Sequence, residues 1–183
     1  TDKNFEYFFG TGVKIRWPKE RPAGLKLCNS NSNLINRLSR ASMDKWKKAL
    51  DGTLKVEPMA VSASYPPFSD LNYRCLYAVD AYIAHTNSEV ARYGVAYNIP
   101  NYEKSEFIDG DLFLFKKEFE KGDLMTSQKL FEHKLSYTLL HEIGHFFGLG
   151  HEFSGNKSIM SYDMTQTPQV SDHDIEALRE LYR

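Results

Sequence analysis

The stretch Thr138–Tyr162, TLLHEIGHFFGLGHEFSGNKSIMSY, decides how the rest of the chain is organised. His141 and His145 are four residues apart, so on a helix they lie on one face with their imidazole rings close together. Gly148 permits the left-handed backbone conformation that ends a helix, which lets the chain turn and bring back His151. Three neutral imidazoles are a ligand set for zinc and leave one coordination position open. The pattern therefore predicts a zinc site of the catalytic kind.

Glu142 follows the first histidine and so projects beside the metal position, where a base for a water molecule belongs. We expect it to take a proton from the attacking water and to deliver that proton to the leaving nitrogen of a peptide. With five positions fixed at set spacing, a chance match in a chain of this length has odds of about one in ten thousand or less. The other histidines, His85, His133 and His173, have no partner at ligand spacing and are interpreted as non-catalytic.

The pattern H-E-x-x-H-x-x-G-x-x-H resembles the signature of the metzincin zinc metalloproteases, which continues into a Met-turn. Ser158–Tyr162, SIMSY, resembles that turn, and Met160 stands nine residues after His151. The resemblance implies a zinc-dependent endopeptidase that acts on protein or peptide substrates. It also implies that Met160 packs beneath the metal as a hydrophobic floor, and that Gly148 has a structural role.

Within the metzincins the features are mixed. The short spacing from His151 to Met160 and the ending SDHDIEALRELY resemble matrixins, whereas Glu152 after the third histidine resembles astacins. Tyr162, two residues after Met160, resembles the tyrosine of astacins and serralysins that binds zinc or stabilises the oxyanion of the transition state. The alternative for Tyr162 is a tyrosine packed below the site. The ending and the short spacing favour a matrixin-like enzyme.

Length and composition limit the number of domains and the kinds of partner that we expect. The chain has 183 residues, which favours one domain over residues 1–183. Its formal net charge of -1 gives no reason to expect nucleic acid as a partner, and no apolar run is long enough to span a bilayer. Thr1 begins no signal-peptide pattern, so we expect a trimmed catalytic unit, with a propeptide or a protein inhibitor as a further candidate partner.

The two cysteines, Cys28 and Cys75, allow either a disulfide or two free thiols. A disulfide would fit a secreted, periplasmic or extracellular protein, which is the location we expect. In a third reading Cys28 caps the zinc, as propeptide cysteines do in matrixins. The surrounding LKLCNSNSN lacks the residues that flank the cysteine in that family's switch.

The order of predicted elements is that of an α+β fold, and the resemblance implies a metzincin catalytic domain. We expect a mixed twisted sheet, a zinc-binding active-site helix, a Met-turn and a C-terminal helix. Within residues 1–33 the pattern predicts one strand and leaves the structure of the rest of that segment open. The predicted strands are Val13–Trp17, Leu54–Glu57, Cys75–Ala84, Tyr93–Asn98 and Glu106–Phe115, and the predicted helices are Leu34–Leu50, Gln128–Phe147 and one that begins at Ser171.

In metzincins an edge strand just before the zinc helix pairs with extended substrate. The resemblance places Asp111, Phe113 and Phe115 in that strand or in its neighbour, and the alternative is an ordinary sheet strand. The pocket that selects substrate is walled in the family by the loop after the Met-turn. The candidate wall residues there are Met164, Thr165 and Pro168.

Asp109 and Asp111 are candidate calcium ligands, because hard cations bind carboxylate oxygens. Two carboxylates fall short of the about six to eight oxygens that calcium takes. Two other functions compete with the endopeptidase. One is a catalytically silent, zinc-dependent protein-binding module of the same fold, which the presence of Glu142 disfavours. The other is a structural zinc protein, with Tyr162 as the fourth ligand.

Overall fold

The structure is a computed structural model of the whole chain. It describes residues 4–28, 30–67, 69–80, 93–120 and 127–183. The elements, in chain order, are β1 Glu6–Tyr7, β2 Gly10–Thr11, β3 Lys26–Cys28, α1 Asn33–Ala49, β4 Ala60–Ser62, β5 Cys75–Val79, β6 Gly94–Asn101, β7 Glu106–Phe115, the 3₁₀ helix η2 Lys116–Glu120, α2 Gln128–Phe147 and α3 Asp172–Leu181. The α+β prediction is confirmed.

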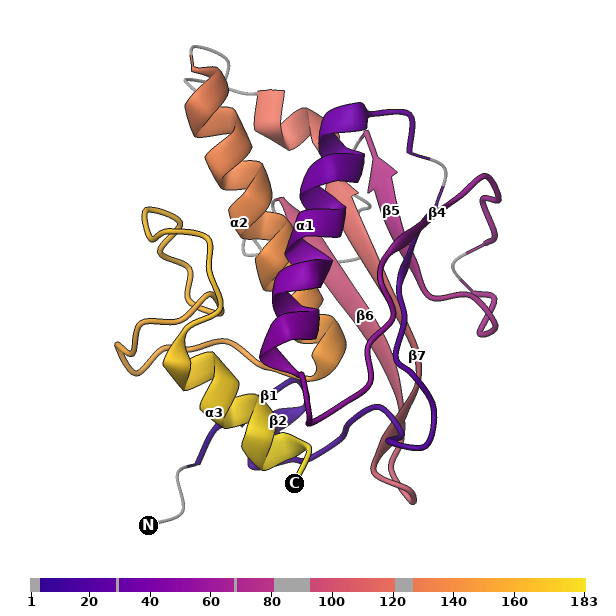
Figure 1. The fold of residues 1–183 in the computed structure, drawn as a ribbon, viewed down its shortest axis with the longest axis vertical. Helices are drawn as coiled ribbons and strands as arrows, with labels where there is room; N and C mark the ends of the chain where they lie inside the picture. The colour runs from indigo at the N-terminus through magenta and orange to yellow at the C-terminus, as the bar shows by residue number, and fades with distance from the viewer. Residues whose placement is uncertain (1–3, 29, 68, 81–92, 121–126) are drawn as a thin grey trace.

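The main sheet has five strands in the order β4-β3-β5-β7-β6. All neighbours are parallel except β6 and β7, which pair antiparallel with a register shift between Ile99 and Pro100. Among the described residues β6 has a partner on one side only, so it is an edge strand, whereas β7 lies between β5 and β6. Helices α1 and α2 cross the same face of this sheet, and α3 lies across their lower ends (Figure 1).

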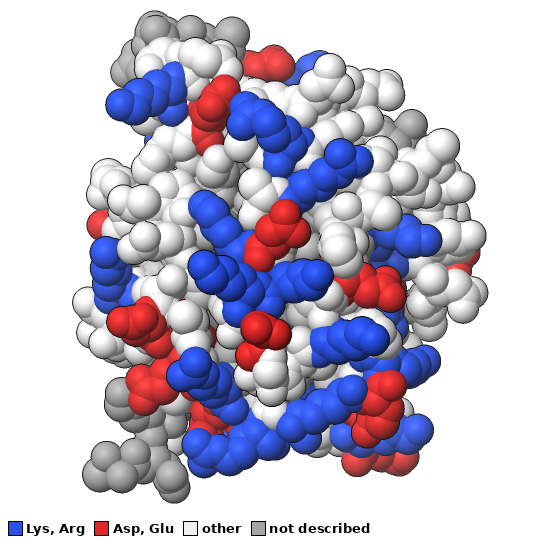
Figure 2. Space-filling model, viewed as in Figure 1, with Lys and Arg blue, Asp and Glu red and all other residues white. Residues whose placement is uncertain are grey.

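Helix α1 follows from its apolar spacing. The side chain of Ser32 caps it by accepting a hydrogen bond from the Ile35 backbone, and the apolar stripe that includes Met43 and Trp46 is buried. The Trp46 indole donates to the Leu140 carbonyl of α2 at 2.8 Å, which joins the two helices. Basic side chains with acidic ones among them cover the face that α1 presents to solvent (Figure 2).

The two faces of β7 contribute to different parts of the core. Leu112 and Leu114 belong to the large hydrophobic cluster beneath the helices. Phe113 and Phe115 point to the opposite face, where they pack with Tyr77 and the two cysteines. Because successive side chains of a strand alternate between faces, one strand holds both clusters together. Cys28 and Cys75 form a disulfide that links β3 to β5 within the second cluster, so the disulfide alternative is confirmed and the thiol alternatives are not.

Several predicted strands differ from the structure. Val13–Trp17 and Leu54–Glu57 are not strands, and each makes only an isolated bridge, at Arg16 and at Val56. The alternation of apolar residues in Val13–Trp17 does reflect burial, since Ile15 and Trp17 are buried and Val13 is exposed. Burial on alternate sides does not by itself provide a neighbouring strand. The prediction for Cys75–Ala84 is met as far as Val79, and residues 81–84 lie outside the described residues.

Asp109 and Asp111 form a buried acid pair on β7, with exposed fractions of 1% and 2%. Burial raises the pKa of Asp111 to about 7, and the neighbouring Asp109 carboxylate raises it too. The Cys75 backbone donates to Asp111 at 3.0 Å. Burial also raises the pKa of Asp109, although the charge of Arg74 opposes that rise. The two carboxyl groups therefore share one proton in mildly acidic solution, as close carboxylates do. The calcium prediction for this pair stays a prediction.

Asp111→Asn tests the acid pair. The pKa of Asp111 is above the value of about 4 for an exposed carboxyl, so the folded protein binds its proton more tightly than the unfolded chain. The free energy of unfolding should therefore fall as pH rises from about 4 to about 7, by at most about 1.4 kcal/mol per pH unit from this group. The variant should lack this contribution and gain stability relative to the wild type over that range, as measured by urea unfolding at several pH values.

The matched control is Asp44→Asn, which makes the same change on the exposed face of α1. The free energy of unfolding of this variant should change with pH in parallel with that of the wild type. If the Asp111→Asn curve also ran parallel, the shared proton would be disproved.

Candidate metal centre

Helix α2 begins and ends where its sequence signals predict. The side chain of Ser127 caps the first turn by accepting from the Leu130 backbone, and Gly148 ends the helix in the left-handed region with a φ of 112°. A side chain at Gly148 would place its Cβ 2.8 Å from a methyl carbon of Leu181. The position therefore requires glycine for both its conformation and its packing.

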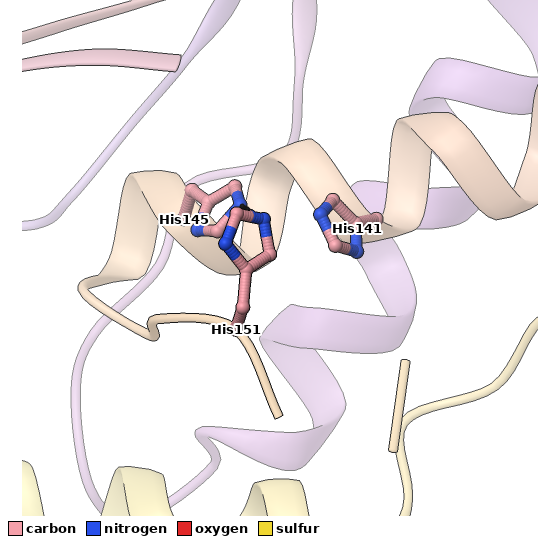
Figure 3. A group of neighbouring side chains, drawn as sticks. All are labelled: His141, His145 and His151. Carbon is pink, nitrogen blue, oxygen red and sulfur yellow. Dashed lines mark hydrogen bonds between the residues drawn. The ribbon is translucent and has the colours of Figure 1, made fainter. Parts of the chain in front are cut away.

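The three predicted histidines come together. His141 and His145 project from successive turns of α2, and His151 approaches from the chain beyond the helix (Figure 3). One ring nitrogen from each lies within 4.8 Å of the others, and the Nε2 atoms of His145 and His151 are 3.1 Å apart. Two nitrogens that share a tetrahedral zinc are separated by roughly 3.3 Å, given the usual zinc–nitrogen bond length. Among the described residues this is the only cluster of three or more His, Cys, Asp or Glu side chains suited to a metal.

The orientation of two rings is fixed by backbone carbonyls. His141 Nδ1 lies 2.8 Å from the Ile159 carbonyl, and His145 Nδ1 lies 2.7 Å from the Leu149 carbonyl. A carbonyl oxygen can only accept a hydrogen bond, so Nδ1 carries the proton in both rings and Nε2 keeps a free lone pair. This is the arrangement by which proteins prepare histidine for a metal.

The electrostatics of the cluster favour neutral ligands. Burial lowers the pKa of His141 to about 4 and that of His145 well below its usual value. Near neutral pH, protons therefore do not compete with a metal for either ring. Burial also raises the pKa of Glu142 to about 8. Its Oε2 atom is buried and makes no hydrogen bond to any residue that the structure describes. A cation beside this carboxyl would lower its pKa and favour the charged form, so these residues fit a divalent metal.

Met160 is buried below the histidine helix, with an exposed fraction of 2%. A Cβ at Gly144 would lie 2.5 Å from the Met160 sulfur and 2.9 Å from the Trp46 ring. The glycine therefore lets Met160 and Trp46 approach the helix backbone directly beneath the metal-binding turn. The expected hydrophobic floor is present in the structure.

Asp174 holds the turn that contains Met160. One of its carboxylate oxygens accepts from the Ile159 backbone at 3.0 Å, and the other accepts from the Ser158 hydroxyl. The Ile159 carbonyl in turn accepts from His141, so a hydrogen-bonded chain links α3 to the first ligand. Within α3 itself Asp174 forms a capping box with Ser171, a role that their spacing in the sequence indicates. Nothing in the sequence indicates its second role, because that role depends on where α3 packs.

Tyr162 lies beside the third ligand. Its hydroxyl oxygen is 3.0 Å from each ring nitrogen of His151, and 42% of the side chain is exposed. Burial of the hydroxyl raises the pKa of Tyr162 to about 12, so the hydroxyl keeps its proton near neutral pH and can donate a hydrogen bond. The exposed fraction argues against the alternative of a tyrosine packed below the site.

Comparison with known proteins identifies the family. A sequence model of the matrixin family matches residues 82–183, more than half of the chain and all three histidines. The chain belongs to the matrixin family. Matrixins are metzincin zinc peptidases, as the motif predicted.

Two solved structures share the fold of this matrixin. One is archaemetzincin from Methanopyrus kandleri, with a TM-score of 0.55 and 17% identity over 90% of this chain and 97% of the other. The other is a zinc-dependent peptidase from Methanocorpusculum labreanum (strain Z), with a TM-score of 0.51 and 15% identity over 85% of this chain and 100% of the other. At these identities the likeness concerns the fold. No curated protein matches the chain.

Of the two edge strands that the structure describes, β4 and β6, the matrixin's β6 is the one beside the predicted strand Glu106–Phe115. Asp111, Phe113 and Phe115 are on β7, the neighbouring strand, and they are buried on the sheet face opposite the helices. The prediction placed these three in the edge strand or in its neighbour, and the second form is met, because β7 pairs with β6. Hydrophobicity and β propensity indicate that a segment is a strand, but not which of two paired strands is outermost. A part for the three residues in binding substrate stays a prediction.

The loop after the Met-turn packs beside the helices. Met164 packs partly against the large cluster and bonds through its carbonyl to His133, and the Pro168 carbonyl accepts from Lys45. The Thr165 backbone donates to Asp163 within the loop. A substrate-selecting role for Met164, Thr165 and Pro168 stays a prediction.

A pocket of about 380 Å³ opens beside the three histidines. Its walls come from β6, from the metal-binding residues and from the hairpin formed by β1 and β2, whose lining residues include Phe8. Phe153, just after the third ligand, also lines it. This hairpin was not predicted from the sequence, although the turn-forming Gly10 and the aromatic pair Phe8-Phe9 are a usable signal for it. A larger hollow of about 570 Å³ lies away from the histidines.

The remaining histidines are not in the cluster. His133 bonds to the Met164 carbonyl, and His173 pairs with Glu152 at 2.7 Å. His85 lies outside the described residues.

Asp174→Asn should loosen the first ligand through the Met-turn. The single amide oxygen can accept from the Ile159 and Ser171 backbones, so the buried Ser158 hydroxyl loses its charged acceptor, at a cost of about 2 kcal/mol in the free energy of unfolding. We expect zinc affinity to fall about tenfold as the support of His141 weakens. Zinc competition with a chelating dye and urea unfolding measure the two effects.

Asp172→Asn is the matched control, since Asp172 is exposed in the same helical turn. It should leave zinc affinity unchanged. Loss of stability in Asp174→Asn with unaltered zinc affinity would show that Asp174 does not position the ligand.

Proposed function

We propose that this matrixin is a zinc endopeptidase in which Glu142 is the general base and acid. The observation that carries the proposal is the meeting of three ring nitrogens, two of them oriented by backbone carbonyls, beside a buried and unpartnered carboxyl oxygen. Zinc held by these rings would supply Lewis acidity, which polarises a peptide carbonyl and acidifies a water molecule.

Glu142 manages the proton in this proposal. Its carboxylate accepts a proton from water as the water oxygen attacks the carbonyl carbon, and it then donates that proton to the nitrogen as the C–N bond breaks. Gly94 of β6 leaves room for this side chain, because a Cβ there would lie 3.0 Å from Glu142 Cγ. The neutral hydroxyl of Tyr162 is the candidate donor to the oxyanion that develops on the carbonyl oxygen.

Edge strand β6 is the candidate site for the substrate backbone. Its outer N–H and C=O groups can pair with an extended peptide, as edge strands commonly do. The family resemblance implies antiparallel pairing. Gly94 then stands near the cleaved bond, since a Cβ there would lie 3.0 Å from Glu142 Cγ.

Two competing functions, a silent binding module and a structural zinc protein, each make a demand on the site that differs from that of the endopeptidase. A silent binding module of the same fold has no use for a buried carboxyl oxygen without a partner at the metal, and Glu142 Oε2 is such an oxygen among the described residues. A structural zinc protein needs a fourth ligand, for which Tyr162 is the nearest candidate. Cleavage of a denatured protein by the zinc-loaded enzyme separates the endopeptidase from both.

We further propose that the protein works outside the reducing cytosol as a single domain over residues 1–183. The buried disulfide between Cys28 and Cys75 supports an oxidising location, because such bonds form and persist there. No helix in the described part of the chain is both long enough and apolar enough to cross a membrane. A removed propeptide or a protein inhibitor remains a proposed partner.

Glu142→Gln tests the proton transfer. The substitution keeps the size of the side chain but removes its ability to accept a proton, so kcat/KM for a peptide should fall by about 10³-fold or more. Zinc content, measured on the purified protein, should stay at one ion per chain. Glu132→Gln, an equivalent change nearer the start of α2, should retain activity, and an active Glu142→Gln enzyme would disprove the mechanism.

Removal of the metal should abolish cleavage and lower thermal stability. A chelator takes away a ligand that binds only the folded protein, so the melting temperature should fall together with activity. Adding zinc back should restore both. Full cleavage by protein that elemental analysis shows to be free of metal would refute the zinc mechanism.

A further inference from the structure

The hairpin of β1 and β2 is fixed against the segment between the second and third histidines. The Phe8 backbone donates to the Gly148 carbonyl at 2.8 Å, and the Gly150 backbone donates to the Glu6 carbonyl at 2.9 Å. A Cβ at Gly150 would lie 2.5 Å from the Tyr7 carbonyl oxygen, so the two backbones pack without space for a side chain. The hairpin is therefore held in place by the same turn that brings back His151.

This attachment places an aromatic wall at the metal centre. The Phe8 ring lies edge-on to the His145 ring at 5.7 Å, and the Phe153 ring lies 5.8 Å from the His151 ring. Both phenylalanines line the pocket of about 380 Å³, together with Val95 and Ala96 of β6. Phe153 is 71% exposed, so its ring is accessible to a ligand in the pocket.

The chemistry of the pocket favours one class of side chain. Its lining includes the aromatic rings of Phe8 and Phe153 and the aliphatic side chains of β6, together with the carboxylates of Glu6 and Glu142 but no lysine or arginine. Such a pocket attracts a large apolar or aromatic side chain and repels an acidic one.

The direction of β6 decides which side chains of a bound peptide would enter this pocket, those before or those after the cleaved bond. Gly94 stands next to Glu142, and Asn98, four residues further on, donates from its side chain to the His145 carbonyl at 2.7 Å. A peptide antiparallel to β6 runs its N-terminal residues toward Asn98. Phe8 lies against His145, so the pocket is on the N-terminal side of the bond to be cleaved.

We infer that Phe8 of the N-terminal hairpin, together with Phe153, forms a specificity subsite for a large apolar or aromatic side chain among the three residues before the cleaved bond. The inference rests on the proposed endopeptidase function and on antiparallel pairing with β6. It assigns to the first residues of the chain a direct part in substrate selection.

The test is the cleavage profile of a peptide library for the wild type, Phe8→Ala and Phe153→Ala. The wild type should select Phe, Leu or Met and reject Asp and Glu at one of the three positions before the cut. Each variant should lose that preference by about tenfold at the same position only. Phe153→Ala keeps the test decisive if Phe8→Ala does not fold, because Phe153 is mostly exposed.

Phe9→Ala is the matched control. Phe9 is the neighbouring aromatic residue of the same hairpin, but its ring packs against Tyr102 and Phe107, and it does not line the pocket. It should alter stability without changing the profile. A change of profile equal to that of Phe8→Ala would show a general loosening of the hairpin and would overturn the inference.

A second readout does not depend on turnover. Hexapeptides with Phe or Ala at the selected position are titrated by calorimetry into the zinc-loaded Glu142→Gln protein. The Phe peptide should bind about tenfold more tightly, and Phe8→Ala in that background should remove the difference.

The outcomes separate the two proposals. If the wild type cleaves no peptide, the endopeptidase function fails, and the subsite falls with it. If the wild type cleaves but its preference is unaffected by both Phe8→Ala and Phe153→Ala, or lies after the cut, the endopeptidase function stands and the subsite is overturned.

Discussion

The hydrogen bonds from His141 and His145 to two backbone carbonyls are the interactions on which the metal centre depends. A neutral imidazole carries its proton on either nitrogen, and only one choice leaves Nε2 able to bind a metal. The carbonyls of Ile159 and Leu149 make that choice. Both belong to the chain after α2, so the ligands on the helix are usable only once the following segment has turned back at Gly148.

The same segment connects the site to the hydrophobic core. Asp174 at the start of α3 holds the turn that contains Ile159 and Met160, and Met160 fits beneath the helix where Gly144 has no side chain. Packing of α3 therefore supports the orientation of His141 through a buried carboxylate. The metal centre is in this way a product of the whole C-terminal half of the fold, and ligand geometry and core stability are coupled.

The sequence predicted the parts of the fold that local periodicity specifies. α1, α2 and α3 lie at their predicted positions, and each has a capping residue. The apolar stripes of α1 and α3 follow the helical period, whereas the second half of α2 is buried on all sides. Strands were predicted less well. Val13–Trp17 has the alternation of a strand, yet its backbone meets no strand of the sheet beyond a single bridge at Arg16. A strand exists only with a partner, and partners are brought by distant parts of the chain.

By itself the sequence determined the metal ligands, the adjacent Glu142 and the turn at Gly148. The spacing of His141, Glu142 and His145 on one helix fixes their relation before any tertiary contact forms, and Gly148 marks where the chain turns back toward His151. Only the tertiary structure decided which strand lies at the edge, how Asp174 reaches the Met-turn and that the N-terminal hairpin borders the site. These contacts join residues far apart in sequence, as with Phe8 and His145. Their geometry follows from how the packed core brings the elements together, which no local pattern specifies.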